Sequence, residues 1–131
     1  MNNQIEIIYS GDLRTWSTHL QSGDDIFTDA PLDNQGKGEA FSPTDLVASA
    51  LGSCMLTIMG IAAKTQKINI DGTYVKVEKI MGDEPRRISK IKLEVFFIEF
   101  ISDKHRIVLE RAAQHCPVLE SLHPDVKKVI S

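Results

Sequence analysis

The stretch from Leu46 to Ala63, LVASALGSCMLTIMGIAA, decides how this sequence folds. It carries no charged side chain and is long enough to suggest a membrane-spanning helix. However, it is rich in small and polar residues such as Ser53 and Gly60, no belt of aromatic residues flanks it, and the rest of the chain is dense in charge. We therefore interpret it as a buried helix of a soluble protein.

The residues around this stretch mark the ends of the helix. Ser42 is a suitable cap, Pro43 suits the first helical position, and Asp45 completes a capping box with Ser42. We expect the helix to end between Lys64 and Lys67. Because the helix is apolar on every face, it has to be covered all round, and one small sheet cannot wrap it. The sequence therefore predicts a homodimer.

The segment before the helix predicts strands. Ile5–Tyr9 and Leu13–His19 alternate around a turn at residues 10–12, which indicates a hairpin. Asp25–Thr28 is expected to add a short third strand, and the glycine-bearing stretch Asn34–Glu39 is expected to be a loop.

The segment after the helix predicts a second hairpin and two short helices. Tyr74–Ile80 and Ile88–Ile101 indicate antiparallel strands joined by a charged turn. A helix is expected from Ser102 to Cys116, where Pro117 ends it. The last expected elements are a short helix and a strand, Val118–Leu122 and Val126–Ile130. The whole pattern predicts one α+β domain over residues 1–131, with antiparallel sheets around a central buried cysteine-bearing helix.

Composition narrows the class of protein. The chain has 131 residues, of which 42% are hydrophobic and 25% charged, and its net charge is -3. This balance is typical of a soluble globular protein and gives no reason to expect a nucleic-acid or membrane partner. The first residues, MNNQIEIIYSGD, show no secretory signal, so we expect a cytoplasmic protein.

The two cysteines carry the candidate chemistry. Cys54 lies within the apolar helix and Cys116 at the helix break before Pro117. Taken alone, Cys54 is most simply a small core residue. A zinc site would need ligands from the histidines, which show no recognisable spacing, and a Cys/His acyl-transfer site lacks any protease-like signature. We therefore expect no metal and no cofactor. The histidines considered as zinc ligands are His19, His105, His115 and His123.

Three motifs resemble the OsmC/Ohr family, the osmotically inducible and organic hydroperoxide resistance proteins. They are GDLRTW at residues 11–16, FSPTDLVASALGSCMLTIMG at residues 41–60 and AAQHCPVLESL at residues 112–122. The resemblance covers nearly the whole chain. It implies two interlocked subunits with sheets around central cysteine-bearing helices, and a thiol peroxidase site at the dimer interface.

The resemblance also implies a role for each site residue. Cys54 would attack the hydroperoxide, Cys116 would close a disulfide with it, and an external thiol or dithiol would restore both. Because an apolar interior disfavours a thiolate, this chemistry needs a cation, and Arg14 matches the place of the family's catalytic arginine.

One position departs from the family pattern. The organic hydroperoxide resistance branch has a glutamate that holds the arginine, whereas this chain has Thr44 there and Asp45 next to it. Asp45 either pairs with Arg14 or serves only the capping box. Glu39 is a weaker substitute.

Two functions remain open at this level. The first, implied by the resemblance, is a thiol-dependent peroxidase, and the apolar residues around Cys54 favour organic hydroperoxides over hydrogen peroxide as its substrates. The alternative is a non-catalytic protein that binds a small ligand or senses redox state with the same fold. Hydroperoxide consumption with a dithiol reductant separates the two.

Overall fold

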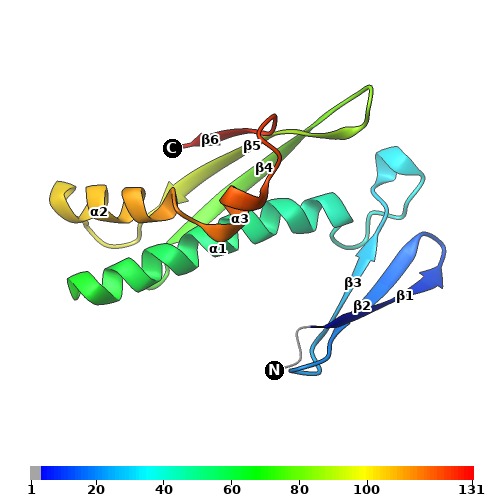
Figure 1. The fold of residues 1–131 in the computed structure, drawn as a ribbon, viewed down its shortest axis with the longest axis horizontal. Coiled ribbons are helices and arrows are strands. Elements are labelled where there is room, and N and C mark those ends of the chain that lie inside the picture. The colour runs from blue at the N-terminus through cyan, green and yellow to red at the C-terminus, as the bar shows by residue number, and fades with distance from the viewer. Residues whose placement is uncertain (1–3) are drawn as a thin grey trace. The chain divides into compact units, whose positions relative to one another are not determined.

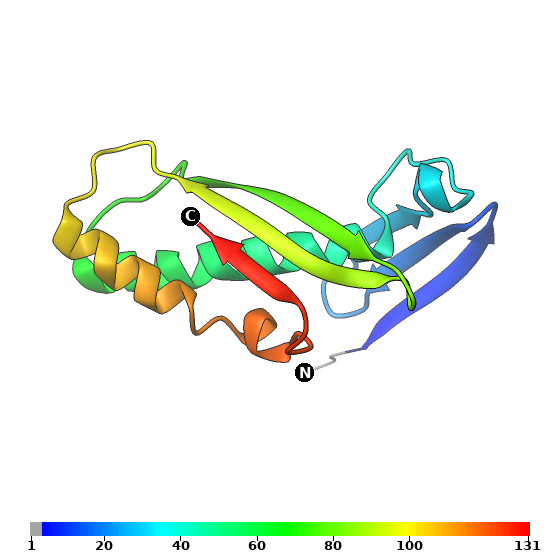
Figure 2. The ribbon, with the colours of Figure 1, turned by 90° about the horizontal axis from the view of Figure 1, so that it is seen from above.

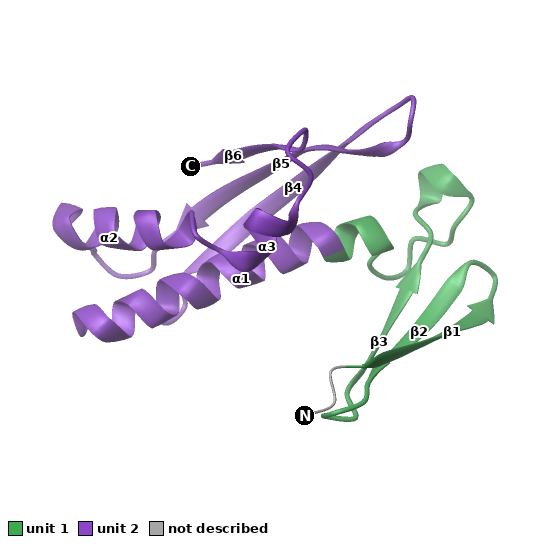
Figure 3. Ribbon diagram, viewed as in Figure 1, with its two compact units in different colours: residues 1–46 green, residues 47–131 purple. Residues whose placement is uncertain are grey.

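The computed structural model describes residues 4–131, and the chain divides into two compact units. The first is Met1–Leu46 and the second Val47–Ser131 (Figure 3). The elements are α-helices and strands in separate sheets, which confirms the predicted α+β class.

The first unit contains an antiparallel three-stranded sheet in the order β1-β2-β3 (Figure 1). β1 is Ile5–Gly11, β2 is Arg14–His19 and β3 is Asp25–Asp29. The turn between β1 and β2 places Asp12 and Leu13 at positive φ, as tight hairpins require. The predicted hairpin and third strand are therefore confirmed.

A single 3-10 turn, η1, at Leu32–Asn34 follows β3 and ends where the predicted loop Asn34–Glu39 begins. Beyond it the chain is irregular up to Ser42, where α1 begins. The capping box is present: Ser42 Oγ accepts from the Asp45 N–H at 3.1 Å, and Asp45 Oδ2 accepts from the Ser42 N–H at 3.0 Å. The predicted start of the helix is therefore confirmed.

The second unit packs most of α1, Pro43–Gln66, along a three-stranded sheet (Figures 1 and 2). The strands are β4 at Tyr74–Gly82, β5 at Arg87–Phe96 and β6 at Lys127–Ile130, in the order β4-β5-β6. β4 and β5 form the predicted antiparallel hairpin, whereas β6 runs parallel to β5. A parallel neighbour needs a long crossover, and residues 97–126 provide it with α2 and α3.

β5 ends at Phe96, not at Ile101 as predicted from its apolar sequence. Tyr74 and Phe96 are the last paired residues of the β4–β5 ladder, because β4 begins at Tyr74, just after a turn at Gly72 with φ +86. Past Phe96 the backbone has no ladder to continue. Apolar side chains there alternate between the core, as at Phe97, and the surface, as at Phe100.

Two short helices follow β5. α2, Asp103–Ala113, begins at Ser102, whose side chain caps it by accepting from the His105 N–H. α3, Pro117–Ser121, has Cys116 as its N-terminal cap residue and proline at its first position. Both lie close to the predicted ranges.

α1 has one buried face and one exposed face. The buried face packs on β4, β5 and α2, and consists of Ala48, Leu51, Gly52, Met55, Met59 and Ala63. Gly52 permits the closest approach, because a Cβ there would lie 3.0 Å from Val77 Cγ2. By length and composition α1 could cross a membrane, but a helix with one face packed in a protein core passes the same test.

Candidate functional site

Cys54 lies on α1, at the border between its buried and exposed faces. Its side chain is partly buried and packs against the core cluster that includes Met55 and Cys116. Leu51, one turn earlier in the helix, is fully buried. The packing of that turn therefore fixes the position of Cys54 relative to the sheet. A thiol in this place combines an apolar surrounding with access to the surface.

Cys116 is fully buried at the start of α3. Its backbone is extended, with φ -76 and ψ 131, because the following proline disfavours a helical conformation at this position. Its carbonyl accepts from the Glu120 N–H at 3.1 Å, the first hydrogen bond of α3. The same proline that ends the predicted helix therefore turns this thiol into the core.

The two thiols lie close together in the same core cluster. Burial raises the pKa of Cys116, and a hydrogen bond with the Cys54 side chain raises it further, against a smaller opposing effect of the Leu119 and Val118 N–H groups. Neither cysteine is in a disulfide. A buried thiol with a raised pKa stays protonated at neutral pH, and only the thiolate is a strong nucleophile. The pair therefore combines a partly accessible thiol, Cys54, with a buried and protonated thiol, Cys116.

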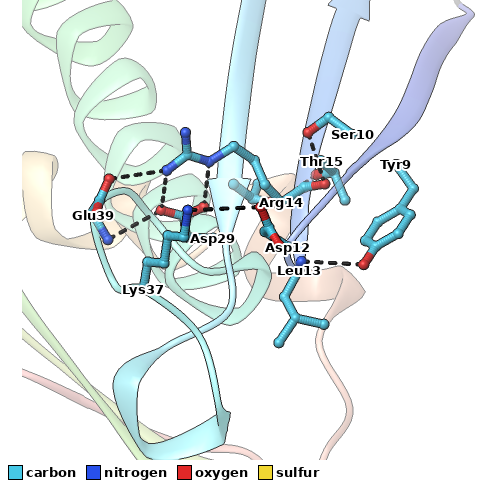
Figure 4. Close-up of polar contacts among 10 residues, drawn as sticks. Tyr9, Ser10, Asp12, Leu13, Arg14, Thr15, Asp29, Lys37 and Glu39 are labelled. Atoms are coloured by element: carbon cyan, nitrogen blue, oxygen red, sulfur yellow. Dashed lines mark hydrogen bonds and ion pairs between the residues drawn. The ribbon is translucent and has the colours of Figure 1, made fainter.

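Arg14 lies in the first unit, at the first position of β2. Its Nε donates to Asp29 Oδ1 at 2.7 Å and its Nη2 to Asp29 Oδ2 at 2.8 Å, a two-point ion pair (Figure 4). Nη2 also donates to Glu39 Oε2 at 3.2 Å. The guanidinium lies over the Phe27 ring, 4.9 Å from its centroid. Arg14 is therefore a held cation and not a freely solvated one.

Asp29 is the partner of Arg14 that the sequence analysis missed. Its side chain is buried, and the Arg14 ion pair holds its pKa below the usual value. The register of the β2–β3 hairpin pairs Arg14 directly with Asp29, as it pairs Thr18 with Asp25. A turn placed at residues 20–24 gives this register. The pairing of Arg14 with Asp29 could therefore have been found from the sequence once the third strand was accepted.

The other acidic candidates divide between two tasks. Glu39, considered a weaker substitute for the glutamate, contacts Arg14. Asp45 takes part in the capping box of α1. The ion-pair cluster of Arg14, Asp29 and Glu39 belongs to the first unit, and the thiol pair belongs to the second.

A cavity of about 310 Å³ lies in the second unit. Two of its lining residues, Met55 and Gln114, are close in sequence to Cys54 and Cys116. Its apolar lining comes from α1, β5, the residue after β5, α2 and β6: Met55, Met59, Val95, Phe97, Ala113 and Ile130. Arg106, Glu110 and Gln114 supply polar groups to it. Within residues 4–131, no group of three or more His, Cys, Asp or Glu side chains is placed to hold a metal ion.

Comparisons with known proteins agree with this fold. A family model described as OsmC-like protein matches residues 36–130. A candidate osmotic-stress-induced and detoxification-response protein from Psychrobacter arcticus 273-4 is 48% identical, with a TM-score of 0.95 over 99% of this chain and 94% of that chain. No curated protein matches the chain.

Two more distant solved structures share the fold. An organic hydroperoxide resistance protein OsmC from Legionella pneumophila is 16% identical, with a TM-score of 0.77 over 98% of this chain and 95% of that chain. A candidate organic hydroperoxide resistance protein from Vibrio cholerae, with captopril bound in one of its active sites, is 17% identical, with a TM-score of 0.76 over 98% of this chain and 90% of that chain.

Proposed function

Because the chain belongs to the OsmC-like protein family, we propose that it is a thiol-dependent peroxidase that reduces organic hydroperoxides through Cys54 and Cys116. The observation that carries this proposal is that the two thiols lie close together in one core cluster. Two cysteines distant in sequence meet at the border of the core, one partly accessible and one fully buried. A structural core would need neither the pairing nor the difference in exposure.

The reaction follows from this difference. The Cys54 thiolate attacks the distal oxygen of a hydroperoxide, the O–O bond breaks, and the alcohol leaves with one proton, which oxidises the sulfur to a sulfenic acid. The Cys116 thiol then attacks the Cys54 sulfur, forms the disulfide and releases water. Two external thiols, or one dithiol, reduce the disulfide. Because Cys116 stays protonated, it is protected from direct oxidation until the sulfenic acid forms.

Arg14 supplies the cation in this proposal. A thiolate beside apolar side chains is disfavoured by desolvation, so a nearby positive charge is needed to favour it. Arg14 is supported in this role by its match to the family motif and by its held guanidinium. The apolar residues beside Cys54, such as Ile58, favour a hydrophobic substituent on the hydroperoxide over hydrogen peroxide itself.

We propose that the working form is a homodimer in the cytoplasm. α1 leaves a face of mostly apolar and small residues uncovered, which includes Val47, Ala50 and Ile61. The sheet of the first unit also exposes large apolar side chains, namely Ile5, Ile7, Ile8, Tyr9, Trp16, Ile26 and Phe27. Apolar surface of this extent marks an interface. Sedimentation should give twice the chain mass; a stable monomer at micromolar concentration would contradict the dimer.

The decisive experiment measures turnover. Purified protein is mixed with tert-butyl hydroperoxide, cumene hydroperoxide or hydrogen peroxide in the presence of a dithiol, and peroxide loss is followed with Cys54→Ser as the blank. We expect fast loss of both organic hydroperoxides and slower loss of hydrogen peroxide. Absence of consumption with every dithiol and monothiol tested would reject the peroxidase.

A second function, binding of a small ligand without turnover, is favoured by the cavity of about 310 Å³ beside Met55 and Met59. Its apolar lining and few polar groups are typical of small-molecule sites. A hydrophobic probe whose binding is unchanged in Cys54→Ser, together with absent peroxidase activity, would favour this function. Loss of turnover in that variant with unchanged probe binding is the outcome expected for an enzyme.

A further inference from the structure

Arg14 has two carboxylate partners of unlike character. Asp29 bonds through both oxygens, at 2.7 and 2.8 Å, and its side chain is 1% exposed. Glu39 bonds through one oxygen at 3.2 Å, and its side chain is 66% exposed. Figure 4 shows the guanidinium between the two carboxylates. One partner is built into the sheet and the other reaches in from a surface loop.

We propose that Asp29 is the residue that positions Arg14 for its action on the Cys54 thiolate, and that Glu39 is a replaceable second partner whose charge opposes this action. The inference rests on the proposed peroxidase function. The residue that holds the arginine in the organic hydroperoxide resistance branch is a glutamate, and this chain has Thr44 there instead. The proposal gives that task to Asp29.

The surroundings of Asp29 support a permanent anchor. Arg14 and Asp29 are direct neighbours across the β2–β3 ladder, so the backbone itself fixes their separation. Asp29 Oδ2 also accepts from the Glu39 N–H at 3.2 Å, and the Asp29 N–H donates to the Phe41 carbonyl at 3.1 Å. The ring of Phe27 supports the other face of the guanidinium. Arg14 therefore has little freedom to turn away from Asp29.

The charge balance indicates a different role for Glu39. A guanidinium paired with one carboxylate is neutral as a group but still presents its remaining N–H donors to a nearby anion. A second carboxylate gives these three side chains a net negative charge and occupies a donor. Such a group opposes a thiolate and does not favour it. Lys37, whose charge also acts on Asp29, is itself paired with Asp12. Because an exposed ion pair contributes little to stability, Glu39 can leave at little cost.

The proposed anchor does not include Asp45. Both of its capping-box hydrogen bonds connect it with Ser42. A carboxylate in that place stabilises the start of α1 through the helix dipole as well as through the cap. Its effect is therefore expected on helix stability.

The test compares Asp29→Asn, Asp29→Glu and Glu39→Gln with the wild type. Asp25→Asn is the matched control, because Asp25 lies on the same strand and pairs across the same ladder with Thr18 instead of an arginine. Two readouts are used: the rate constant for tert-butyl hydroperoxide, and the pH profile of Cys54 alkylation by iodoacetamide in a Cys116→Ser background. The second depends on the thiolate alone.

Asp29→Asn should slow both reactions near neutral pH by about threefold to tenfold and move the alkylation profile to higher pH, because fewer thiolates form but each is more nucleophilic. Asp29→Glu should restore part of the loss. Glu39→Gln should accelerate alkylation by about twofold or more and move the profile to lower pH. In an Arg14→Ala background, Asp29→Asn should change neither readout. If Asp29 had a merely structural role, the substitution would still change the readouts in that background.

Each failure has its own signature. If the wild type consumes hydroperoxide and Asp29→Asn alkylates at the wild-type rate, the anchor is wrong and the peroxidase stands. If the wild type consumes no hydroperoxide but the alkylation profiles move as expected, the peroxidase is wrong and the anchor stands. A Glu39→Gln profile identical to the wild type overturns the role of Glu39. If Asp29→Asn does not fold, Glu39→Gln and Asp29→Glu still decide.

Discussion

The thiol pair and the ion-pair cluster of Arg14, Asp29 and Glu39 are held by different forces. Cys54 and Cys116 are positioned by apolar packing, where Leu51 and Met55 are fully buried and movement would open a cavity. The ion-pair cluster is held by hydrogen bonds on a sheet whose apolar side chains are largely exposed. The sulfur atoms are therefore fixed by the core, whereas Arg14 keeps its buried partner Asp29 and can lose only the exposed one, Glu39.

The largest expected effects separate the two sulfurs. Cys54→Ser should abolish turnover, because the nucleophile is gone. Cys116→Ser should permit one reduction per chain, after which the Cys54 sulfenic acid accumulates or oxidises further. Stopped-flow measurement with excess hydroperoxide and mass spectrometry of the products distinguish the two. Continued turnover of Cys116→Ser with a dithiol at the wild-type rate would show that the buried thiol does not resolve the intermediate.

The next effect concerns the charge. Arg14→Ala should slow the first reduction step by about tenfold or more, because the thiolate loses its cation. Arg87→Ala is the matched control: Arg87 also begins a strand, but its guanidinium donates to the carbonyls of Asp83 and Pro85. That control should react as the wild type does. Equal slowing in both variants would mean a general loss of charge and not a specific role.

A smaller effect is expected in the pH dependence of disulfide formation. Burial and the interaction with Cys54 raise the pKa of Cys116. The fraction of Cys116 in the thiolate form therefore keeps increasing with pH across neutral and mildly alkaline conditions. The rate of disulfide formation from a preformed sulfenic acid should therefore rise with pH, by up to about tenfold per pH unit. Quenched-flow trapping of the sulfenic acid measures it. A rate that levels off below the ordinary thiol pKa would contradict the burial effect.

The smallest effect is on stability in acid. The pKa of Asp29 is lower in the folded chain than its ordinary value, so ionised Asp29 stabilises the fold above about pH 4 and this contribution is lost as the pH falls further. The stability gap between the wild type and Asp29→Asn should be widest near neutrality and should narrow on acidification. Urea unfolding followed by fluorescence of Trp16, the single tryptophan, reports on this sheet. Asp25→Asn should show a smaller gap with less pH dependence.

The sequence predicted the elements better than their partners. The capping box of Ser42 and Asp45 and the break at Pro117 follow from local chemistry, so they could be placed without the fold. The end of β5 depends on where β4 begins, and the parallel pairing of β6 depends on the crossover. Neither is encoded in a short stretch of residues.

The candidate site shows the same division. Cys54, Cys116 and Arg14 could be named because their motifs resemble those of the OsmC/Ohr family. Asp29 escaped because an aspartate at the end of a strand is unremarkable until the register of β2 and β3 places it opposite Arg14. Of the acidic candidates considered from the sequence, Glu39 does contact Arg14, but through one oxygen only, whereas Asp29 binds it through both. Their catalytic roles remain predictions.

The missing side chain of Gly52 governs a kinetic competition. A Cβ at this position would lie 3.0 Å from Val77 Cγ2, so the absence of a side chain lets α1 pack close to β4. Cys54 follows within the same turn of helix, and the depth of the helix therefore sets how often its sulfur meets that of Cys116. On the proposed chemistry, this encounter frequency acts as an effective concentration of resolving thiol. A protein with the proposed activity would survive a burst of oxidant only while that concentration outcompetes a second hydroperoxide molecule for the sulfenic acid.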